Sequence, residues 1–421
     1  MSRTYFGTDG VRGVVGEDLT PGLVEQLGRA ATLWSNGGRV FVGRDTRASG
    51  EELEEAFARG VISAGGNAVL AGVLPTPAVA LLALDLGAVI SASHNPPEYN
   101  GVKLFDAEGQ KLTDAAEEEI EALFDAPFDG TPGQVDRVGV ATDSYLDHVV
   151  ERFGTDLGGL KLVVDCANGA YSGIAPSAFE RLGAAVTTIG SDPDGTNINV
   201  GCGATDLSAL QQAVTRTGAD LGIAFDGDGD RMLAVDARGE VVDGDQILAI
   251  LMLHLDVELV AVTVMANLGL HRLAQEQGIR VVTTDVGDRY VLEALRREGG
   301  LLGGEQSGHV IYLRDHVTGD GLAAALLLCG ALEGRTLEEA AAVMSRFPQA
   351  KANIRVAGKE LSQALRSEVE RLNERLDGKG RVLVRASGTE PVVRVLAEAE
   401  TRADAEEACG TISALVRREL G

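Results

Sequence analysis

Aromatic residues, cysteines and lysines are all scarce in this sequence. Phe, Trp and Tyr make up 4% of the 421 residues, so the hydrophobic cores must be built from Ala, Val and Leu. There are only six lysines among 37 basic residues, which makes each lysine worth examining. The 4 cysteines form no CxxC pair and are far apart, which is most simply explained by a reduced, cytoplasmic compartment.

Long hydrophobic runs and an excess of positive charge are also missing. The longest apolar stretch, near residues 322–331, is too short to span a bilayer, and the first residues do not resemble a signal peptide. The net charge of −26 repels nucleic acid and anionic membranes. We therefore expect no nucleic-acid or membrane partner, a monomer or homodimer, and a local basic pocket for any anionic substrate.

Strands and helices alternate in three successive segments of the chain. In each segment helices end at glycines, and the last strand leads into a polar loop. This alternation is typical of parallel α/β sheets, in which ligands bind beyond the carboxyl ends of the strands. After residue 347 the pattern changes to strands around 381–385 and 392–400 with helices at 361–376 and 403–420, which predicts a small α+β unit.

The first polar loop, SASHNPP at residues 91–97, follows a short apolar strand at 88–90. Its two prolines restrict the backbone, and Pro96 disfavours helical backbone at Asn95, so we expect a stiff turn. A hydroxyl held there, that of Ser93, suits a covalent group carrier, although a lone serine more often only caps a turn. His94 should be poorly placed as its base, because neighbouring side chains in extended chain point in opposite directions. We interpret His94 as a loop-packing or phosphate-contacting residue.

The second loop places Asp226, Asp228 and Asp230 on alternate positions with glycines between them. Glycine lets the backbone fold tightly, so the three carboxylates can converge on a hard cation. An EF-hand is excluded, because Arg231 and Ala237 stand where that loop needs Gly and Glu. An incomplete carboxylate cage suits Mg²⁺. The alternative is a solvated acidic turn, in which the carboxylates would repel one another without a cation.

Two further loops carry groups that bind phosphates and sugars. The stretch RASGTEP at 385–391, with Arg394 on the next strand, predicts a phosphate cradle, although the same residues occur in ordinary hairpin turns. The stretch GEQSGH at 304–309 offers the carboxylate, amide, hydroxyl and imidazole needed to bind a polyol.

Two basic side chains remain near the amino-terminal loops. Arg12 could reach a phosphate or only pair with Asp9. Lys103, ten residues after Ser93, could move a proton if it is buried, or could be a surface lysine at the start of a strand. A serine, a metal loop, a sugar loop and a phosphate loop together indicate phosphoryl transfer.

The motifs ISASHNP, AFDGDGDR, GEQSGH and RASGTEP, in this order, resemble those of the α-D-phosphohexomutases over the whole chain. The resemblance implies an α/β fold of three tandem related α/β domains with mixed, mostly parallel sheets and a C-terminal α+β domain around a central cleft. The expected domains are residues 1–152, 153–254, 255–347 and 348–421.

The resemblance also implies roles for individual residues. Ser93 would carry a phosphoryl group as phosphoserine, and one of its oxygens would bind Mg²⁺ together with Asp226, Asp228 and Asp230. Glu305 and Ser307 would hold sugar hydroxyls. The residues expected to grip the phosphate that is not transferred are Arg385, Ser387, Gly388, Thr389 and Arg394. The expected catalytic residues are Ser93, Lys103, His309, Arg12, Arg231 and His94.

The opening YFGTDGVRG, the glutamine in GEQSGH and the following VTGDG are most similar to bacterial family members that act on an amino-sugar phosphate. The expected reaction interconverts glucosamine 6-phosphate and glucosamine 1-phosphate through a 1,6-bisphosphate, which would supply UDP-N-acetylglucosamine and cell-wall synthesis. One alternative is a phosphomannomutase or phosphoglucomutase with the same machinery and a neutral sugar. Another is a catalytically silent, metal-binding sugar-phosphate sensor.

Overall fold

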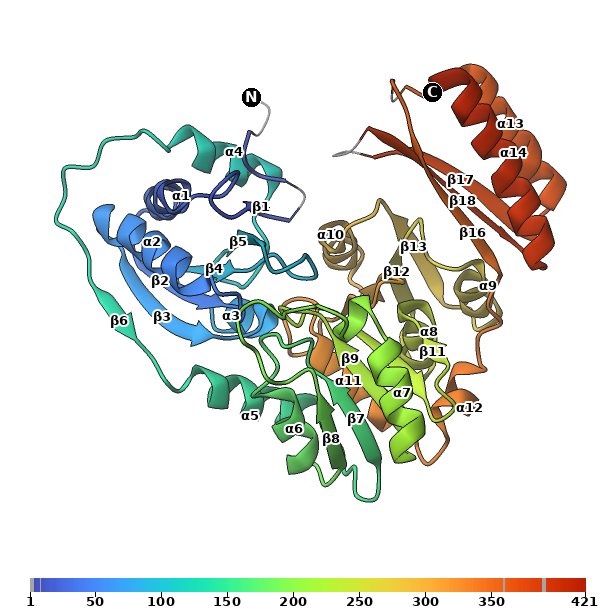
Figure 1. Ribbon diagram of the computed structural model, residues 1–421, viewed down its shortest axis with the longest axis horizontal. Helices are drawn as coiled ribbons and strands as arrows, with labels where there is room; N and C mark the ends of the chain where they lie inside the picture. The colour runs from blue at the N-terminus through green and yellow to red at the C-terminus, as the bar shows by residue number, and fades with distance from the viewer. Residues whose placement is uncertain (1–3, 8, 359, 388–390) are drawn as a thin grey trace. The chain divides into compact units, whose positions relative to one another are not determined.

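The computed structural model describes residues 4–7, 9–358, 360–387 and 391–421 (Figure 1). The chain divides into two compact units, Met1–Thr263 with Val282–Ala341 and Val264–Val281 with Ala342–Gly421, and each is described by itself. The predicted fold class is confirmed: three α/β domains with mixed, mostly parallel sheets precede a C-terminal domain with an antiparallel sheet.

The first α/β domain is built on a six-stranded sheet with the order β1-β5-β4-β2-β3-β6. Strands β2, β3, β4 and β6 run parallel, whereas β5 is antiparallel to both β4 and β1. Residues 11–153 contain β1 (Val11–Val14), α1 (Pro21–Trp34), β2 (Arg39–Arg44), α2 (Gly50–Ser63), β3 (Asn67–Val73), α3 (Thr76–Leu81), β4 (Leu86–Ile90), β5 (Tyr99–Phe105), α4 (Asp114–Ala122), β6 (Val135–Arg137) and α5 (Ala141–Phe153).

Helices α1 and α2 lie side by side (Figure 1) and contribute to the core of this domain. Glycine permits their close approach, because a Cβ at Gly60 would lie 2.0 Å from the carbonyl oxygen of Glu25. Strand β4 reads LGAVI and is buried throughout, as a central strand covered on both faces should be. The antiparallel return of β5 was not predicted, and it places Lys103 opposite Val89 of β4.

The second domain has the sheet order β11-β10-β9-β7-β8, with β7, β8 and β9 parallel and the β9–β10 pair antiparallel. Strand β9 is entirely buried and leads into the aspartate loop. Residues 161–254 contain β7 (Lys161–Asp165), α6 (Ala175–Arg181), β8 (Ala185–Ile189), η1 (Gly203–Thr205), α7 (Ser208–Thr217), β9 (Leu221–Phe225), β10 (Met232–Asp236), β11 (Val241–Val242) and α8 (Gly244–His254).

The third domain has the sheet order β13-β12-β14-β15, with β12 and β14 parallel and β14 and β15 antiparallel. The stretch EQSGH joins β14 to β15, as the sequence predicts for a loop at the carboxyl end of a strand. The elements are β12 (Leu259–Thr263), α9 (Leu268–Glu276), β13 (Arg280–Thr284), α10 (Asp288–Glu298), β14 (Leu302–Gly304), β15 (Val310–Tyr312), α11 (Gly321–Ala331) and α12 (Leu337–Ala341).

The most apolar stretch of the sequence forms α11, nearly all of which is buried inside the first unit. Its side chains therefore face protein on all sides, which explains why the helix is apolar all round. Among the helices of the described part of the chain, none combines the length and the apolar character needed to cross a membrane.

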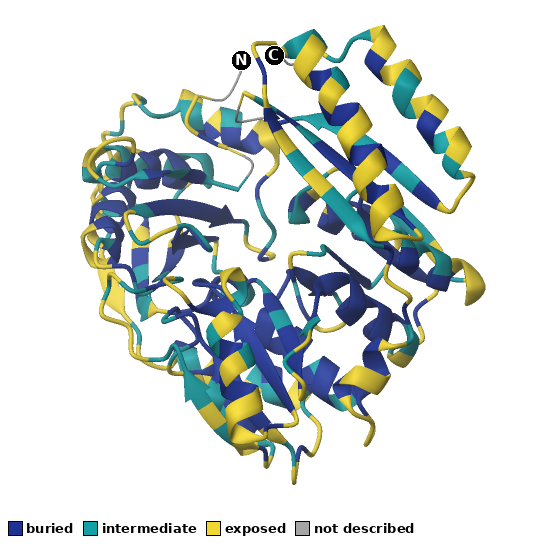
Figure 2. Cartoon of the chain, turned by 45° about the vertical axis from the view of Figure 1, so that its right-hand side comes forward, coloured by how far each residue is buried: buried dark blue, intermediate teal, exposed yellow. Residues whose placement is uncertain are grey.

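The C-terminal domain belongs to the second unit and has a three-stranded antiparallel sheet with the order β16-β18-β17. Helices α13 and α14 pack on one face of this sheet and turn their exposed residues outward (Figures 1 and 2). The elements are β16 (Gln349–Arg355), α13 (Gln363–Leu376), β17 (Gly380–Ala386), β18 (Val392–Ala399) and α14 (Arg402–Leu420).

Candidate active site

Ser93 lies at the carboxyl end of β4, in backbone that L-residues rarely adopt. Its φ is +50°, in the left-handed region. Its Oγ donates to Oδ2 of Asp226 over 2.5 Å and lies 3.4 Å from Nδ1 of His94. The expectation that the Ser93 and His94 side chains point apart was wrong, because it assumed an extended chain. Burial and the cations Arg231 and Arg12 lower the pKa of His94 to about 4, so its imidazole is neutral at pH 7.

The aspartate loop turns the chain between β9 and β10. Oδ1 of Asp226 accepts from the backbone N–H groups of Gly229 (3.1 Å) and Arg231 (3.2 Å), which closes the turn around this carboxylate. Gly229 has φ of +79°, and a Cβ there would lie 2.3 Å from the ring of Tyr171. The loop therefore requires glycine at this position both for its backbone and for its packing.

The three aspartates fit a divalent metal ion. All are buried, and one oxygen of each lies within 4.8 Å of the others. Oδ2 of Asp228 accepts from Thr76 Oγ1 (2.6 Å) and Lys103 Nζ (2.7 Å), whereas its buried Oδ1 has no hydrogen-bond partner among the described residues. An unpaired buried carboxylate oxygen in an all-oxygen cluster suits a hard cation such as Mg²⁺.

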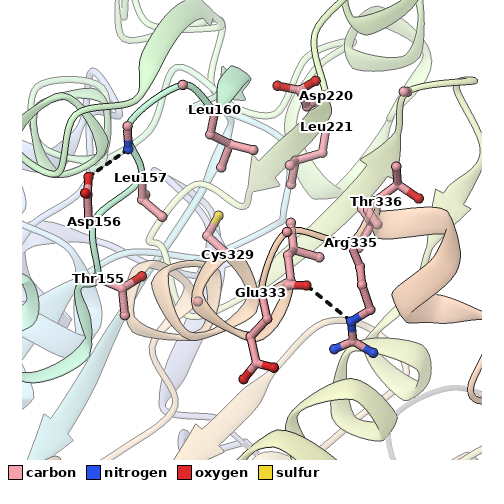
Figure 3. A pocket seen from close by; sticks show the side chains of 17 residues that line it. Thr155, Asp156, Leu157, Leu160, Asp220, Leu221, Cys329, Glu333, Arg335 and Thr336 are labelled. Carbon is pink, nitrogen blue, oxygen red and sulfur yellow. Dashed lines mark hydrogen bonds between the residues drawn. The ribbon is translucent and has the colours of Figure 1, made fainter.

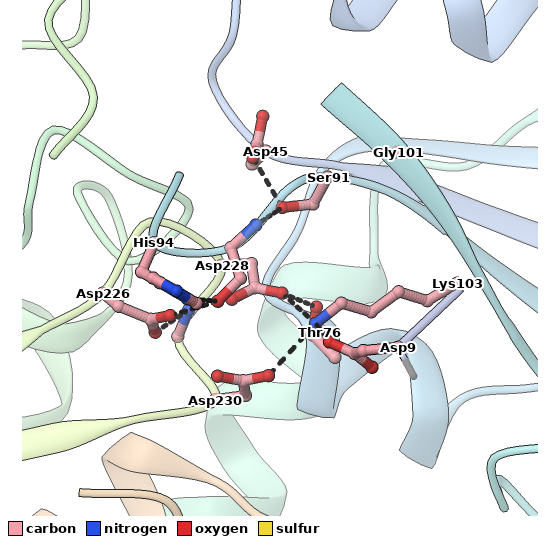
Figure 4. Close-up of polar contacts among 12 residues, drawn as sticks. Asp9, Asp45, Thr76, Ser91, His94, Gly101, Lys103, Asp226, Asp228 and Asp230 are labelled. Atoms are coloured by element: carbon pink, nitrogen blue, oxygen red, sulfur yellow. Dashed lines mark hydrogen bonds and ion pairs between the residues drawn. The ribbon is translucent and has the colours of Figure 1, made fainter. Parts of the chain in front are cut away.

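Lys103 extends from β5 into this cluster (Figure 4). It is only 2% exposed, and Nζ lies 2.7 Å from Asp228, 3.1 Å from Asp230 and 3.2 Å from Asp9. Burial opposes its charge, but the three carboxylates outweigh burial and hold the pKa of Lys103 well above its usual range. Lys103 is thus a buried, protonated ammonium and not the surface lysine of the alternative interpretation.

The charged cluster continues beyond Lys103 to the predicted residue His309 and to Lys111 and Asp288, which the sequence interpretation did not single out. Lys111 contacts Asp9 Oδ1 over 2.6 Å and forms an ion pair with Asp288, at the start of α10. His309 lies between two carboxylates, with Nε2 3.4 Å from Asp288 and Nδ1 3.8 Å from Asp230. Burial disfavours the imidazolium, but Asp288 and Asp230 outweigh burial and raise the pKa of His309.

A sequence signal for these missed residues existed in part. Lys111 is one of the six lysines, and only Lys103 was considered as a chemical group. Asp288 starts a helix, where an acidic residue has an ordinary structural explanation. Thr76 carries no signal at all, because its contact with Asp228 joins positions 152 residues apart.

The two predicted catalytic arginines occupy different environments. Arg12, on β1, forms an ion pair with Asp9, which is the second of the two outcomes considered for it. Arg231 lies 3.8 Å from Asp230 at the end of the aspartate loop. Burial opposes its charge, but Asp230 and Asp226 outweigh burial and raise the pKa of Arg231.

The predicted sugar-binding residues lie on the loop between β14 and β15. Oε1 of Glu305 accepts from the backbone N–H of Gly287 over 3.1 Å, and burial raises the pKa of Glu305. Ser307 is exposed, so its hydroxyl is accessible to a ligand. A Cβ at Gly308 would lie 2.2 Å from the carbonyl oxygen of Met232, so the loop packs tightly against the start of β10.

The predicted phosphate loop belongs to the second unit. Arg385 on β17 and Arg394 on β18 are directly opposite each other in the antiparallel register, so two guanidinium groups start from neighbouring positions. Ser387 donates its backbone N–H to Val392 O over 2.9 Å. Gly388 and Thr389 lie outside the described residues.

A cavity of about 490 Å³ lies at the opposite end of β9 from the aspartate loop (Figure 3). It is lined by the chain before β7, by Asp220 and Leu221, by Cys329 near the end of α11, and by Arg335 in the segment after this helix. None of the predicted site residues lines it, so it is separate from the cluster around Ser93.

Profiles of one protein family match nearly the whole chain, in agreement with the fold and the site described above. Profiles of the phosphoglucomutase/phosphomannomutase family match residues 3–129 as alpha/beta/alpha domain I, 143–239 as domain II, 243–347 as domain III and 333–414 as the C-terminal domain. The chain therefore belongs to the phosphoglucomutase/phosphomannomutase family, within the phosphohexomutase superfamily, and the resemblance inferred from its motifs is confirmed.

The chain is also similar to individual proteins of this family. The chain is 50% identical to the phosphoglucosamine mutase of Pelotomaculum thermopropionicum over 98% of both chains. It is also 50% identical to the phosphoglucosamine mutase of Moorella thermoacetica, over 95% of this chain and 96% of the relative. Among solved structures, a phosphoglucomutase/phosphomannomutase family protein from Burkholderia thailandensis has a TM-score of 0.85 and 26% identity, covering 99% of this chain and 98% of its own.

Proposed function

We propose that the chain is a phosphoglucosamine mutase that interconverts glucosamine 6-phosphate and glucosamine 1-phosphate. The amino sugar is supported by the relatives that are 50% identical over nearly their full length. The observation that carries the mechanism is the placement of Ser93 Oγ, on a left-handed residue, 2.5 Å from the buried aspartate loop.

In the proposed first half-reaction, a sugar hydroxyl oxygen attacks the phosphorus of phosphoserine 93. The bond from phosphorus to Ser93 Oγ breaks, the new bond to the sugar oxygen forms, and the sugar hydroxyl loses its proton as Oγ gains one. The resulting 1,6-bisphosphate turns around, and Ser93 Oγ then takes back the other phosphoryl group by the same exchange of bonds. Mg²⁺ held by the Asp226, Asp228 and Asp230 carboxylates would neutralise charge on the transferring phosphoryl oxygens.

The remaining residues are assigned by their surroundings. Lys103 and His309 both lie beside the aspartate loop, so we assign proton transfer to this pair: in each half-reaction one of them takes the proton that the sugar hydroxyl loses, and the other supplies the proton that Oγ gains. Arg12 and Arg231 would stabilise phosphoryl charge, and neutral His94 would contact the phosphoryl group. Glu305 and Ser307 would bind sugar hydroxyls. The non-transferred phosphate would be bound by Arg385, Ser387, Gly388, Thr389 and Arg394.

Several further properties stay predictions. They are the domain boundaries after residues 152, 254 and 347, a cytoplasmic location, and a monomeric or homodimeric state.

A coupled assay with the phosphoserine form of the enzyme tests the proposed reaction. We expect the kcat/KM for glucosamine 6-phosphate to exceed those for glucose and mannose phosphates. A preference for a neutral sugar would contradict the substrate assignment. No turnover of any sugar phosphate by protein that carries one phosphate on the Ser93 peptide, as measured by mass spectrometry, would contradict the enzymatic function itself.

A further inference from the structure

Arg47 is a buried arginine whose guanidinium faces the backbone of the serine loop. It is 1% exposed. One terminal nitrogen donates to the carbonyl oxygens of Ser93 (2.9 Å) and Asn95 (2.8 Å). The other donates to the carbonyl oxygens of Tyr99 (2.9 Å) and Pro96. A single side chain thus binds four carbonyl groups between the end of β4 and the start of β5.

The carboxylate of Asp45 binds both Arg47 and Ser91. Its Oδ2 accepts from Nε of Arg47 (2.9 Å) and from the hydroxyl of Ser91 (2.6 Å), as Figure 4 shows for Ser91. The Ser91 oxygen in turn accepts from the backbone N–H of Ser93 over 2.9 Å. The buried ion pair of Arg47 and Asp45 therefore holds both backbone polar groups of Ser93. Arg47 binds the carbonyl directly, and Asp45 binds the N–H through the hydroxyl of Ser91.

Asn199 reaches the same carbonyl groups from the second domain. Its Nδ2 donates to the carbonyl oxygens of Ser93 (2.9 Å) and Asn95 (3.2 Å). The Ser93 carbonyl consequently accepts two hydrogen bonds, one from a residue of each domain. Asn199 itself has φ of +60°, a conformation that asparagine tolerates better than most residues.

The conformation of Ser93 explains why such an arrangement is needed. Left-handed backbone is unfavourable for a non-glycine residue, so a free loop would relax toward extended chain. That relaxation would rotate the Ser93 side chain away from Asp226. Arginine suits the task because its planar fork can donate to several acceptors at once, whereas the lysine ammonium is a compact point charge.

We propose that Arg47, with its partner Asp45, and Asn199 are positioning residues that hold Ser93 in its left-handed conformation. Their contacts end on loop backbone and not on the Ser93 hydroxyl, so they act on phosphoryl transfer through the geometry of Ser93. The effect on rate rests on the proposed function, because only a phosphoryl-carrying serine needs this placement.

The test compares Arg47→Lys and Asn199→Gly with the control Arg44→Lys. Arg44 ends β2, three residues before Arg47, but it pairs with Glu54 at 3.5 Å and not with the serine loop. Glycine accepts the φ of position 199 and removes only the side chain. We expect both test variants to lower kcat at least tenfold with KM within twofold of the parent, and to accelerate amide hydrogen exchange in residues 91–99. The control should match the parent in all three measurements.

The measurements separate this proposal from the proposed function. Unchanged exchange in residues 91–99, or faster exchange with kcat within twofold of the parent, would overturn the positioning role. A rise in KM at constant kcat would also overturn it. If the melting curve shows that Arg47→Lys does not fold, the measurements on Asn199→Gly alone test the positioning role. If the parent itself never carries phosphate at Ser93, the proposed function fails, and hydrogen exchange alone then decides whether these residues hold the loop.

Discussion

At the scale of single residues, the charges that surround a buried side chain determine its protonation. Lys103 and His309 would be ordinary titrating groups in water, but the carboxylates around them raise the pKa of each. The sequence predicted Ser93, Lys103 and the aspartates as chemical groups, because their residue types and spacing are unusual. It did not predict Arg47, since one arginine among many carries no local signal of where its guanidinium points.

Replacing Ser93 by alanine removes the oxygen proposed to carry the phosphoryl group. We expect kcat to fall on the order of 10³-fold or more, because no other group can form the phosphoenzyme. Ser63→Ala is a matched control, since that hydroxyl only donates to the Gly60 carbonyl within α2. Turnover by Ser93→Ala above a tenth of the parent rate would refute a covalent carrier at this position.

Metal removal tests the aspartate site. A cation that binds only the folded protein raises its melting temperature. After treatment with EDTA, we expect added Mg²⁺ to restore activity and raise the melting temperature of the parent, but to have little effect on Asp226→Asn. Asp206→Asn should respond like the parent, because Asp206 is exposed and only accepts from Ser208. Equal stabilisation of both variants would contradict metal binding by Asp226.

At the scale of elements, strands with continuous apolar runs were the most predictable part of the fold. The sequences of β4 and β9 are buried throughout, and the helix predicted at 403–420 is found as α14 (Arg402–Leu420). The helix predicted at 361–376 begins two residues later, as α13 (Gln363–Leu376). Strand β5 (YNGVKLF) was considered only as a strand starting at Lys103, and its antiparallel pairing with β4 was not predicted, because no local pattern shows which strands pair.

Helix α9 provides a test of pH dependence. Burial, followed by the charge of Arg381, lowers the pKa of His271 to about 4. The unfolded chain binds a proton at about pH 6.5, so stability from the neutral imidazole is present above this pH and is lost as pH falls toward 4. The loss reaches at most about 3 kcal/mol.

We therefore expect His271→Leu to lose less stability than the parent on acidification. The measurement is the difference in melting temperature between the two proteins from pH 8 to pH 5. This difference should shift in favour of the variant below pH 6.5. A difference that does not change with pH would show that His271 is protonated as readily in the folded protein as in the unfolded chain.

At the scale of the whole molecule, the chain forms two compact units with separate hydrophobic cores. The first unit contains Ser93, the aspartates and the sugar loop, whereas the second contains the pair Arg385 and Arg394. The sequence predicted this change in architecture after residue 347, since the alternation of strands and helices stops there. It did not predict that residues 264–281 belong to the second unit.

Separate cores should unfold separately, so we expect calorimetry to resolve two transitions. Ile412→Ala removes a fully buried side chain of the second unit, and Val61→Ala removes one of the first. Such truncations cost roughly 2–5 kcal/mol for isoleucine and somewhat less for valine. Each variant should lower one transition and leave the other unchanged. If both variants shift the same single transition, the two units unfold as one.

The sequence by itself determined the chemical groups and their order: a serine on a proline-bearing turn, three aspartates spaced by glycine, a polar loop and a basic hairpin. It also determined the alternation that places three of these loops at the carboxyl ends of strands. Only the tertiary structure decided which charges meet. Lys103 reaches Asp228 because β5 returns beside β4, and Arg47 reaches the Ser93 carbonyl because two loops of one sheet pack together. These contacts depend on how distant segments pack and lose water, and spacing along the chain does not encode that.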